Sequence, residues 1–148
     1  MKLFETKTGR CGEWANAFTA ICIALGFEAR RVLDWTDHVW TEIYIEEWGR
    51  WAHADPCENI LDKPLTYEMG WGKQLTYVIA SSNKEIIDVT RRYVVDPLLN
   101  KMRRKEVNEK WLSINLKNRR EKLWDMQEEE DKKILFERFC REQEELTG

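Results

Sequence analysis

Hydrophobic residues recur at intervals of three and four near the beginning of the chain, which is the spacing of one helix face. The residues that share this spacing are Trp14, Phe18, Ile21, Cys22 and Leu25. They predict a helix over residues 12–25, because a period near 3.6 brings such positions onto one side. Gly26 follows where a left-handed C-terminal cap is expected, so the helix should end there.

The pattern then changes to short runs with a period of two, which is typical of strands. The predicted strands cover residues 27–35, 39–45, 50–54, 74–80 and 85–89. In the second strand, aliphatic residues and a threonine alternate with Trp40, Glu42 and Tyr44, so one face is aliphatic and the other is polar and aromatic. A helix followed by successive antiparallel strands predicts an α+β fold, and not a parallel βαβ array.

The composition changes near Pro97 and divides the chain into residues 1–96 and residues 97–148. Nearly half of the second segment is charged, and it has no internal Gly or Pro, so we expect helices there. Apolar residues at a loose helical spacing predict a first helix in this segment. A second helix should follow it, because Asp125 and Glu128 have the spacing of a capping box. The apolar residues of these two helices are Leu98, Leu99, Met102, Val107, Trp111, Ile114, Ile134, Leu135, Phe139 and Leu146.

Charge and cysteine usage narrow the classes of protein. The net charge is -3 and the pI is about 5.6, which predicts neither a nucleic-acid nor a membrane partner. No apolar run approaches the roughly 20 residues of a membrane-spanning helix, and the first residues lack a hydrophobic signal segment. The four cysteines are scattered and form no C-x-x-C pair, so we expect free thiols, a reducing compartment and no metal site in this chain.

Three residues match the requirements of a cysteine nucleophile, which needs a thiolate, a nearby imidazole and a group that orients the imidazole. Cys11 lies in the first turn of the predicted helix, where free N–H groups and the helix dipole favour an anion, and Arg10 adds positive charge beside it. His38 begins one predicted strand, and Asp55 ends the next. If these strands form a hairpin, both side chains lie at one end of the sheet, and the helix can present Cys11 to them.

Structural roles remain open for each of these residues. A cysteine at a helix start is usually structural, His38 could lie on the surface, and Asp55 before Pro56 could start a turn. His53 is a competing base, although it lies two residues before Asp55 on the same face of one strand. We interpret Cys57 as part of the turn that follows.

Several linked motifs resemble those of the cytosolic peptide:N-glycanase family, within the transglutaminase-like superfamily. GRCGEWAN at residues 9–16 is similar to the family's nucleophile motif, DHVWTE at 37–42 to its histidine motif and WAHADPCE at 51–58 to its aspartate motif. The resemblance continues through residues 62–65, 67–73 and 88–93. It therefore covers residues 3–93 and implies a papain- and transglutaminase-like helix packed on an antiparallel sheet, followed by the helical segment.

The resemblance implies an amidase that cleaves the bond between an asparagine side chain and the first N-acetylglucosamine of an N-glycan. Carried over by motif, Cys11 is the nucleophile, His38 the general base and acid, and Asp55 the residue that orients His38. Trp40, Glu42 and Arg10 are the expected substrate-binding residues, with Trp40 and Glu42 as walls of the glycan cleft. The family acts on misfolded glycoproteins exported from the endoplasmic reticulum, so we expect a cytoplasmic protein.

The chain also departs from the family. The family's catalytic domain has a substantial part before the nucleophile motif, with two C-x-x-C pairs that bind a structural zinc, whereas only ten residues precede Cys11 here. We therefore expect this chain to be the C-terminal part of a larger catalytic core, with no cofactor of its own and with the zinc in the upstream part. Family members have C-terminal helices that can dock a ubiquitin-receptor shuttle protein, so residues 97–148 either bind such a partner or only pack on the catalytic segment.

Two other functions share these residues. A non-catalytic transglutaminase-like scaffold or protein-interaction module would keep the fold without the reaction, as DNA-repair relatives of the superfamily do. A transglutaminase or cysteine protease could use the same three side chains. The motifs outside the three catalytic positions favour the glycanase.

Overall fold

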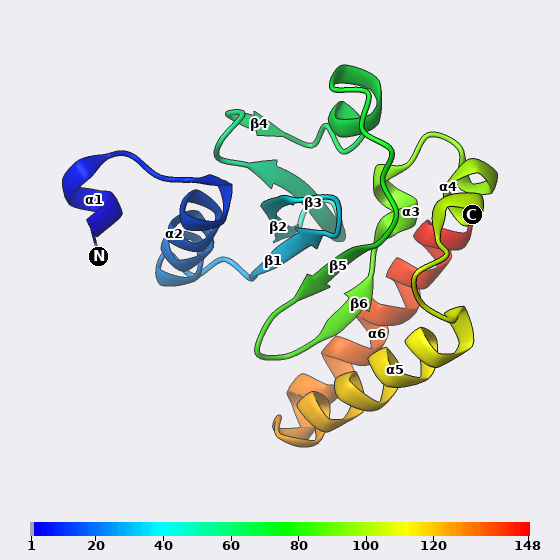
Figure 1. Ribbon diagram of the computed structural model, residues 1–148. Helices are drawn as coiled ribbons and strands as arrows, with labels where there is room; N and C mark the ends of the chain where they lie inside the picture. The colour runs from blue at the N-terminus through cyan, green and yellow to red at the C-terminus, as the bar shows by residue number, and fades with distance from the viewer. Residues whose placement is uncertain (1) are drawn as a thin grey trace.

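The computed structural model describes residues 2–148 as a mixed α and β structure (Figure 1). The strands are β1 (Ala29–Asp34), β2 (His38–Ile45), β3 (Arg50–Asp55), β4 (Ile60–Leu61), β5 (Val78–Ser81) and β6 (Ile86–Asp88). The helices are α1 (Lys2–Thr6), α2 (Cys11–Ala24), the π-helix η1 (Thr66–Gly70), α3 (Thr90–Tyr93), α4 (Pro97–Arg103), α5 (Glu109–Asp125) and α6 (Glu129–Thr147). Helix α2 confirms the predicted N-terminal helix to within one residue, and Gly26 after it has the left-handed φ of 89° that the sequence predicts.

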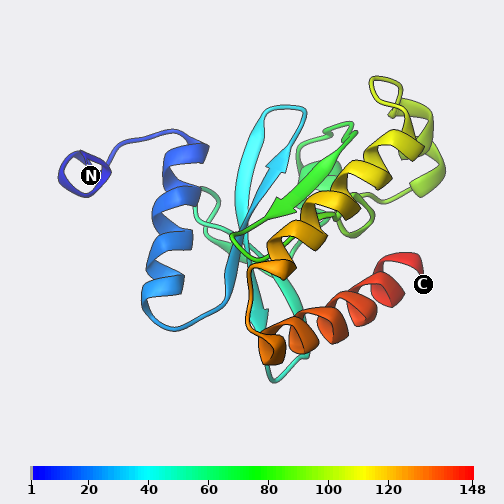
Figure 2. The same ribbon diagram turned by 90° about the horizontal axis from the view of Figure 1, so that it is seen from below.

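The strands form one antiparallel sheet in the order β4-β3-β2-β1-β5-β6. Helix α2 covers one face, and α5 and α6 lie on the other side (Figure 2). The predicted α+β fold with a helix packed on an antiparallel sheet is therefore confirmed. The predicted strand at residues 74–80 begins only at Val78, because the carbonyls of Leu75 and Thr76 accept hydrogen bonds from the Asn100 side chain and not from a neighbouring strand.

Strand β2 has the two different faces that its alternation predicts. The hydroxyl of Thr41 faces α2, where it lies 2.9 Å from the hydroxyl of Thr19 and 3.4 Å from the carbonyl of Ala15. Trp40 and Glu42 point to the other face. Both faces are buried, so β2 is covered on each side.

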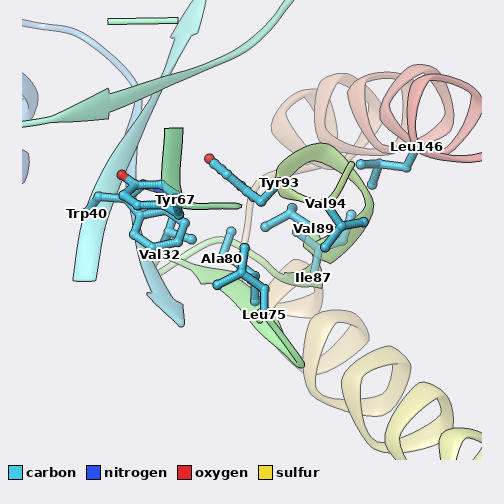
Figure 3. Packing of buried hydrophobic residues seen from close by; sticks show 11 residues of the cluster. Val32, Trp40, Tyr67, Leu75, Ala80, Ile87, Val89, Tyr93, Val94 and Leu146 are labelled. Atoms are coloured by element: carbon cyan, nitrogen blue, oxygen red, sulfur yellow. The ribbon is translucent and has the colours of Figure 1, made fainter. Parts of the chain in front are cut away.

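The main hydrophobic core lies on the face away from α2 (Figure 3). Trp40 stacks on Tyr67 with 4.2 Å between ring centroids and meets Tyr93 edge-on at 4.8 Å. Leu146 of α6 joins the same cluster. Aromatic pairs in these geometries add to the gain from burial, so this cluster holds η1, α3 and α6 against the sheet.

The two long C-terminal helices differ in how they are held. Helix α6 buries Leu135, Arg138, Glu142 and Leu146, whereas no residue of α5 is buried. The predicted capping box is wrong, because α5 continues through Asp125 and Glu128 is itself the residue before α6, without a side-chain cap. The stripe predicted over residues 98–114 is divided between α4 and α5, and Val107 lies in the loop between them.

A buried group of charges fixes α6 to the sheet. Arg30 on β1 is fully buried and forms ion pairs with Glu42, Glu85 and Glu142. Arg92 on α3 pairs with Glu42 and Glu142 as well. We call these five residues the Arg30 cluster. Because its members come from β1, β2, α3, α6 and the turn before β6, it joins the two segments of the chain.

Candidate active site

The predicted contact between His38 and Asp55 is present. The antiparallel pairing of β2 with β3 sets Thr41 opposite Ala54, which brings the first residue of β2 and the last of β3 to the same end of the sheet. His38 Nε2 lies 2.8 Å from Asp55 Oδ2. Both side chains are buried, with 9% of His38 and none of Asp55 exposed, so water competes little for this bond.

Asp55 accepts hydrogen bonds on both of its oxygens. Oδ2 also accepts from the Tyr67 hydroxyl at 2.8 Å, and Oδ1 accepts from the backbone N–H groups of Cys57 at 2.9 Å and Glu58 at 3.3 Å. Burial alone would favour the neutral acid, but the hydrogen bonds from His38 and Tyr67 outweigh it and hold the pKa of Asp55 below its ordinary value. The carboxylate is therefore ionised and fixed in orientation.

His53 extends this set of hydrogen bonds into the core. It is fully buried, its Nε2 lies 2.6 Å from the Tyr67 hydroxyl, and its Nδ1 accepts from the backbone N–H of Lys63 at 3.2 Å. Burial lowers the pKa of His53 to about 4, so its imidazole is neutral at pH 7. A ring with no exposed surface cannot take a proton from a substrate, so the geometry does not support His53 as the competing base. We call His38, Asp55, Tyr67 and His53 the Asp55 network.

Cys11 is the first residue of α2 and is partly exposed. It lies near the turn after Asp55. Burial, together with the neighbouring Asp55 carboxylate and Cys11 side chain, raises the pKa of the Cys57 thiol to about 11. Within residues 2–148, no hydrogen bond joins the Cys11 sulfur to His38, and the close approach of these two groups stays a prediction.

Aromatic rings surround His38. The ring centroids of Trp71, Tyr67 and Trp40 lie 5.0, 5.4 and 5.6 Å from that of His38. Trp71 is 41% exposed, whereas Trp40 has no exposed surface. The expectation that Trp40 lines a cleft is therefore wrong for this structure, because Tyr67 and Tyr93 cover its indole. Trp71 is therefore the exposed one of the three aromatic side chains beside His38.

The expectation for Glu42 is also wrong. Glu42 is fully buried, pairs with Arg30 and Arg92, and accepts a hydrogen bond from Tyr93 at 2.6 Å. Burial opposes its ionisation, but the two guanidinium groups prevail and lower the pKa of Glu42 to about 2. Alternation placed Glu42 on the correct face, yet its carboxylate is committed to the Arg30 cluster and not to a substrate.

Arg10 stands just before α2 and is exposed. Its backbone N–H donates to Glu13 Oε2 at 2.6 Å, which closes the first turn of the helix that carries Cys11. The structure thus places Arg10 beside Cys11. Its role toward a substrate stays a prediction.

Sequence reasoning gave no role to Tyr67, Lys73 or Asp34. Asp34 is buried opposite His38 in the β1–β2 pairing, and Lys73 Nζ lies 2.6 Å from its Oδ2. This ion pair ties the segment after η1 to the strand ends that carry the site. Tyr67 and Lys73 belong to the run YEMGWGK at residues 67–73, which the family resemblance includes. A π-helix has no regular hydrophobic spacing, so the sequence alone does not distinguish Tyr67 from its neighbours.

The part of the chain that the structure describes contains no group of three or more His, Cys, Asp or Glu side chains arranged to hold a metal ion. Over the same residues, no helix combines the length and apolar character needed to cross a bilayer.

Two family models match the sequence. The transglutaminase-like superfamily model matches residues 1–56, and the Rad4 transglutaminase-like domain model matches residues 35–142. The second match covers most of the chain and includes β2, β3, α4, α5 and the greater part of α6. The chain belongs to the Rad4 transglutaminase-like domain family.

Curated relatives of this transglutaminase-like domain share one name. A rat protein named peptide-N(4)-(N-acetyl-beta-glucosaminyl)asparagine amidase is 51% identical over 143 residues, which is 95% of this chain and 22% of the rat protein. Proteins of the same name from chicken and human are 67% and 64% identical over 92 residues, 62% of this chain and 14% of each relative. The chain thus spans about a fifth or less of the length of these relatives.

A solved structure shows the same fold. The crystal structure of Rad4–Rad23 bound to a 6-4 photoproduct UV lesion contains a chain that aligns with a TM-score of 0.58 and 19% identity, over 89% of this chain and 34% of that one. At this identity the likeness concerns the fold alone. It extends the transglutaminase-like architecture over nearly the whole chain, including the helices after residue 97.

Proposed function

We propose that this transglutaminase-like domain supplies the catalytic residues of an amidase that removes N-linked glycans by hydrolysing the bond between asparagine and N-acetylglucosamine. The observation that carries the proposal is the His38–Asp55 hydrogen bond at the strand ends beside the helix that begins with Cys11. The names of the rat, chicken and human relatives support the choice of substrate.

The reaction begins with proton transfer from the Cys11 thiol to His38. Because Asp55 holds Nε2, the opposite ring nitrogen, Nδ1, is the one that can accept this proton. The thiolate then attacks the side-chain carbonyl carbon of the glycosylated asparagine. The tetrahedral intermediate collapses with cleavage of the C–N bond, and His38 returns the proton to the departing glycosylamine.

Hydrolysis of the resulting thioester completes the cycle. His38 takes a proton from water, the hydroxide adds to the thioester carbon, and the Cys11 thiolate leaves. The protein product carries aspartate where asparagine stood, and its new oxygen comes from water. Free N–H groups at the start of α2 can stabilise the oxyanion in both halves of the reaction.

The wider setting is part of the same proposal. Misfolded glycoproteins in the cytoplasm are the substrates, and a ubiquitin-receptor shuttle protein is the partner that brings them. Apolar side chains on α4 and α5 that are exposed within residues 2–148 give that partner a surface: Leu98, Leu99, Met102, Trp111 and Ile114. Because the similar solved structure is a Rad4–Rad23 complex, a Rad23-like protein is the first partner to test.

A denatured N-glycopeptide is the substrate for the decisive assay, in water enriched in oxygen-18. Two proteins are compared: the 148-residue chain, and a chimera in which it replaces the matching segment of the rat relative. We expect the chimera to release glycan and to leave one heavy oxygen in the new aspartate. We expect little release from the chain alone, because positioning of a substrate is worth about 7–11 kcal/mol of barrier.

Cys11→Ala and Cys57→Ala form the matched pair of variants in the chimera. Cys57 contacts Asp55 and is close to Cys11, but its raised pKa keeps the Cys57 thiol protonated. Cys11→Ala should abolish release and Cys57→Ala should retain it. Release that survives Cys11→Ala would exclude the covalent mechanism.

One observation favours a second function, a non-catalytic scaffold. Cys11 makes no hydrogen bond to His38 in the described residues, and the fold matches a chain of the DNA-bound Rad4–Rad23 complex. A chimera that binds a Rad23-like protein but releases no glycan would support the scaffold over the amidase.

A further inference from the structure

We propose that Tyr67 and His53 are positioning residues that act on His38 through Asp55. Neither one is placed to touch a substrate, since both are fully buried. The inference rests on the proposed amidase function and extends it, because it names side chains outside the Cys-His-Asp set on which the reaction depends.

The direction of every hydrogen bond in the Asp55 network follows from one backbone group. The Lys63 N–H can only donate, so His53 Nδ1 must be the unprotonated nitrogen of its neutral ring. His53 therefore carries its proton on Nε2 and donates it to the Tyr67 oxygen. The Tyr67 proton is then free to point at Asp55 Oδ2, 2.8 Å away.

The same direction fixes the histidine at the site. An ionised carboxylate only accepts, so the His38 nitrogen that faces Asp55 must carry a proton. Tyr67 and His38 share Oδ2, while the N–H groups of Cys57 and Glu58 occupy Oδ1, so the carboxylate has little freedom to turn. His38 is thereby kept in the tautomer whose free lone pair lies on Nδ1, as a base for Cys11 requires.

The placement of Tyr67 is locally unusual, which is a second and independent observation. Tyr67 lies in η1, a five-residue π-helix, and this type of turn is rare and frequent at functional sites. Its ring stacks on Trp40, so the hydroxyl is held in place by packing as well as by its two partners. Burial and the Asp55 carboxylate raise the pKa of Tyr67, so it stays a donor throughout the working pH range.

Tyr93 provides a matched control. It is also a fully buried tyrosine of the same core cluster, and its hydroxyl also donates to a buried carboxylate, that of Glu42. Tyr67→Phe and Tyr93→Phe remove the same atom from comparable surroundings. Only the first removes a bond from the Asp55 network.

Two readouts separate positioning from simple packing. In the 148-residue chain, which has two histidines, the NMR signal of the His38 Nε2–H proton that faces Asp55 is recorded. In the chimera with the rat relative, kcat and KM for glycan release are measured. We expect Tyr67→Phe to lose the His38 signal. It should also lower kcat roughly 10–100-fold with KM unchanged, which is the usual loss when a residue that orients a metal ligand is replaced. Tyr93→Phe should keep both.

Equal behaviour of Tyr67→Phe and Tyr93→Phe would overturn the proposal. So would a Tyr67→Phe variant that loses kcat but keeps the His38 signal, or one that loses the signal but keeps kcat. If Tyr67→Phe does not fold, His53→Leu and His53→Gln decide the question. The glutamine amide can still donate to Tyr67, so it should retain more activity than leucine, and equal kcat values would contradict the role. If the wild-type chimera releases no glycan, the proposed function fails, while the NMR comparison still tests the positioning.

Discussion

The Asp55 network and the Arg30 cluster are both buried polar groups on one face of the same sheet, but they have different structural roles. The Asp55 network has one carboxylate and no Lys or Arg, and each of its partners fixes a direction. The Arg30 cluster combines two guanidinium groups with three carboxylates and joins elements far apart in the chain. The comparison indicates that the first orients a reactive side chain and the second holds α6 in place.

Their energetics should differ accordingly. Breaking a buried ion pair leaves an uncompensated charge in the core, which is expensive for the whole fold. Removing one hydrogen bond of the Asp55 network costs less stability, about 1–3 kcal/mol, but changes which proton can move. Substitutions in the two groups should therefore separate loss of activity from loss of stability.

Asp55→Asn should have the largest effect, on activity. The asparagine amide can present an N–H to His38 and so stabilise the wrong tautomer, which in a comparable triad lowers kcat about 10⁴-fold. Glycan release by the chimera measures the effect. Asp62→Asn is the control, since Asp62 pairs with Arg50 at a partly exposed site, and it should release glycan at the wild-type rate.

Arg30→Met should have the next largest effect, on stability. It leaves Glu42, Glu85 and Glu142 without their shared partner, at a cost of about 3–5 kcal/mol. Urea unfolding of the chain measures it. Arg50→Met breaks a partly exposed pair and should cost no more than about 1 kcal/mol, so a similar loss from both variants would contradict the distinction.

Acid should destabilise the protein through His53. Its pKa in the folded protein, about 4, lies below the ordinary 6.5, so the unfolded chain binds the proton first as pH falls. This contribution is fully present above pH 6.5 and is lost between about pH 6.5 and 4, up to about 3 kcal/mol. Unfolding by urea at pH 7 and pH 5 measures it, and His53→Gln should flatten the dependence.

Glu85 in the Arg30 cluster should act in the opposite direction. Burial raises the pKa of Glu85, so the folded protein binds this proton before the unfolded chain does. Protonation of Glu85 therefore stabilises the folded protein as the pH falls toward the ordinary pKa of a glutamate side chain. Glu85→Gln should therefore steepen the loss of stability in acid, and a flatter curve would contradict the sign.

Trp111→Ser should have the smallest effect on stability, within about 0.5 kcal/mol, because the side chain is 57% exposed on α5. Its expected effect is on affinity for a Rad23-like protein, measured by calorimetry. Lys117→Ser on the same helix is the control for a general change of surface. Unchanged affinity in Trp111→Ser would remove this residue from the proposed surface.

The sequence predicted the elements whose signals are local. The helix at Cys11 has a period of 3.6, and His38 and Asp55 stand at the ends of alternating strands, so their neighbourhood could be expected from a hairpin alone. Trp40 and Glu42 were placed on the correct face but at the wrong depth. Alternation gives the face of a strand, whereas the residues that cover it here come from η1, α3 and α6.

Tyr67 and Glu142 show why the rest could not be predicted. Tyr67 contacts Asp55 from a π-helix, and no regular spacing of hydrophobic residues in the sequence predicts such a helix. Glu142 is one of many acidic residues in a charged helix, and nothing in its neighbours distinguishes it from those in solvent. Only the docking of α6 against Arg30 decides which carboxylate is buried.

That docking has a kinetic consequence. The bond between Arg30 and Glu142 joins residues 112 apart in the chain, whereas His38 and Asp55 are 17 apart and Asp55 and Tyr67 are 12 apart. Closing the longer loop costs about 2 kcal/mol more in chain entropy than closing the 17-residue one. Contacts of such long separation form late. We therefore expect the hairpins at the active-site end of the sheet to form first and α6 to dock after them.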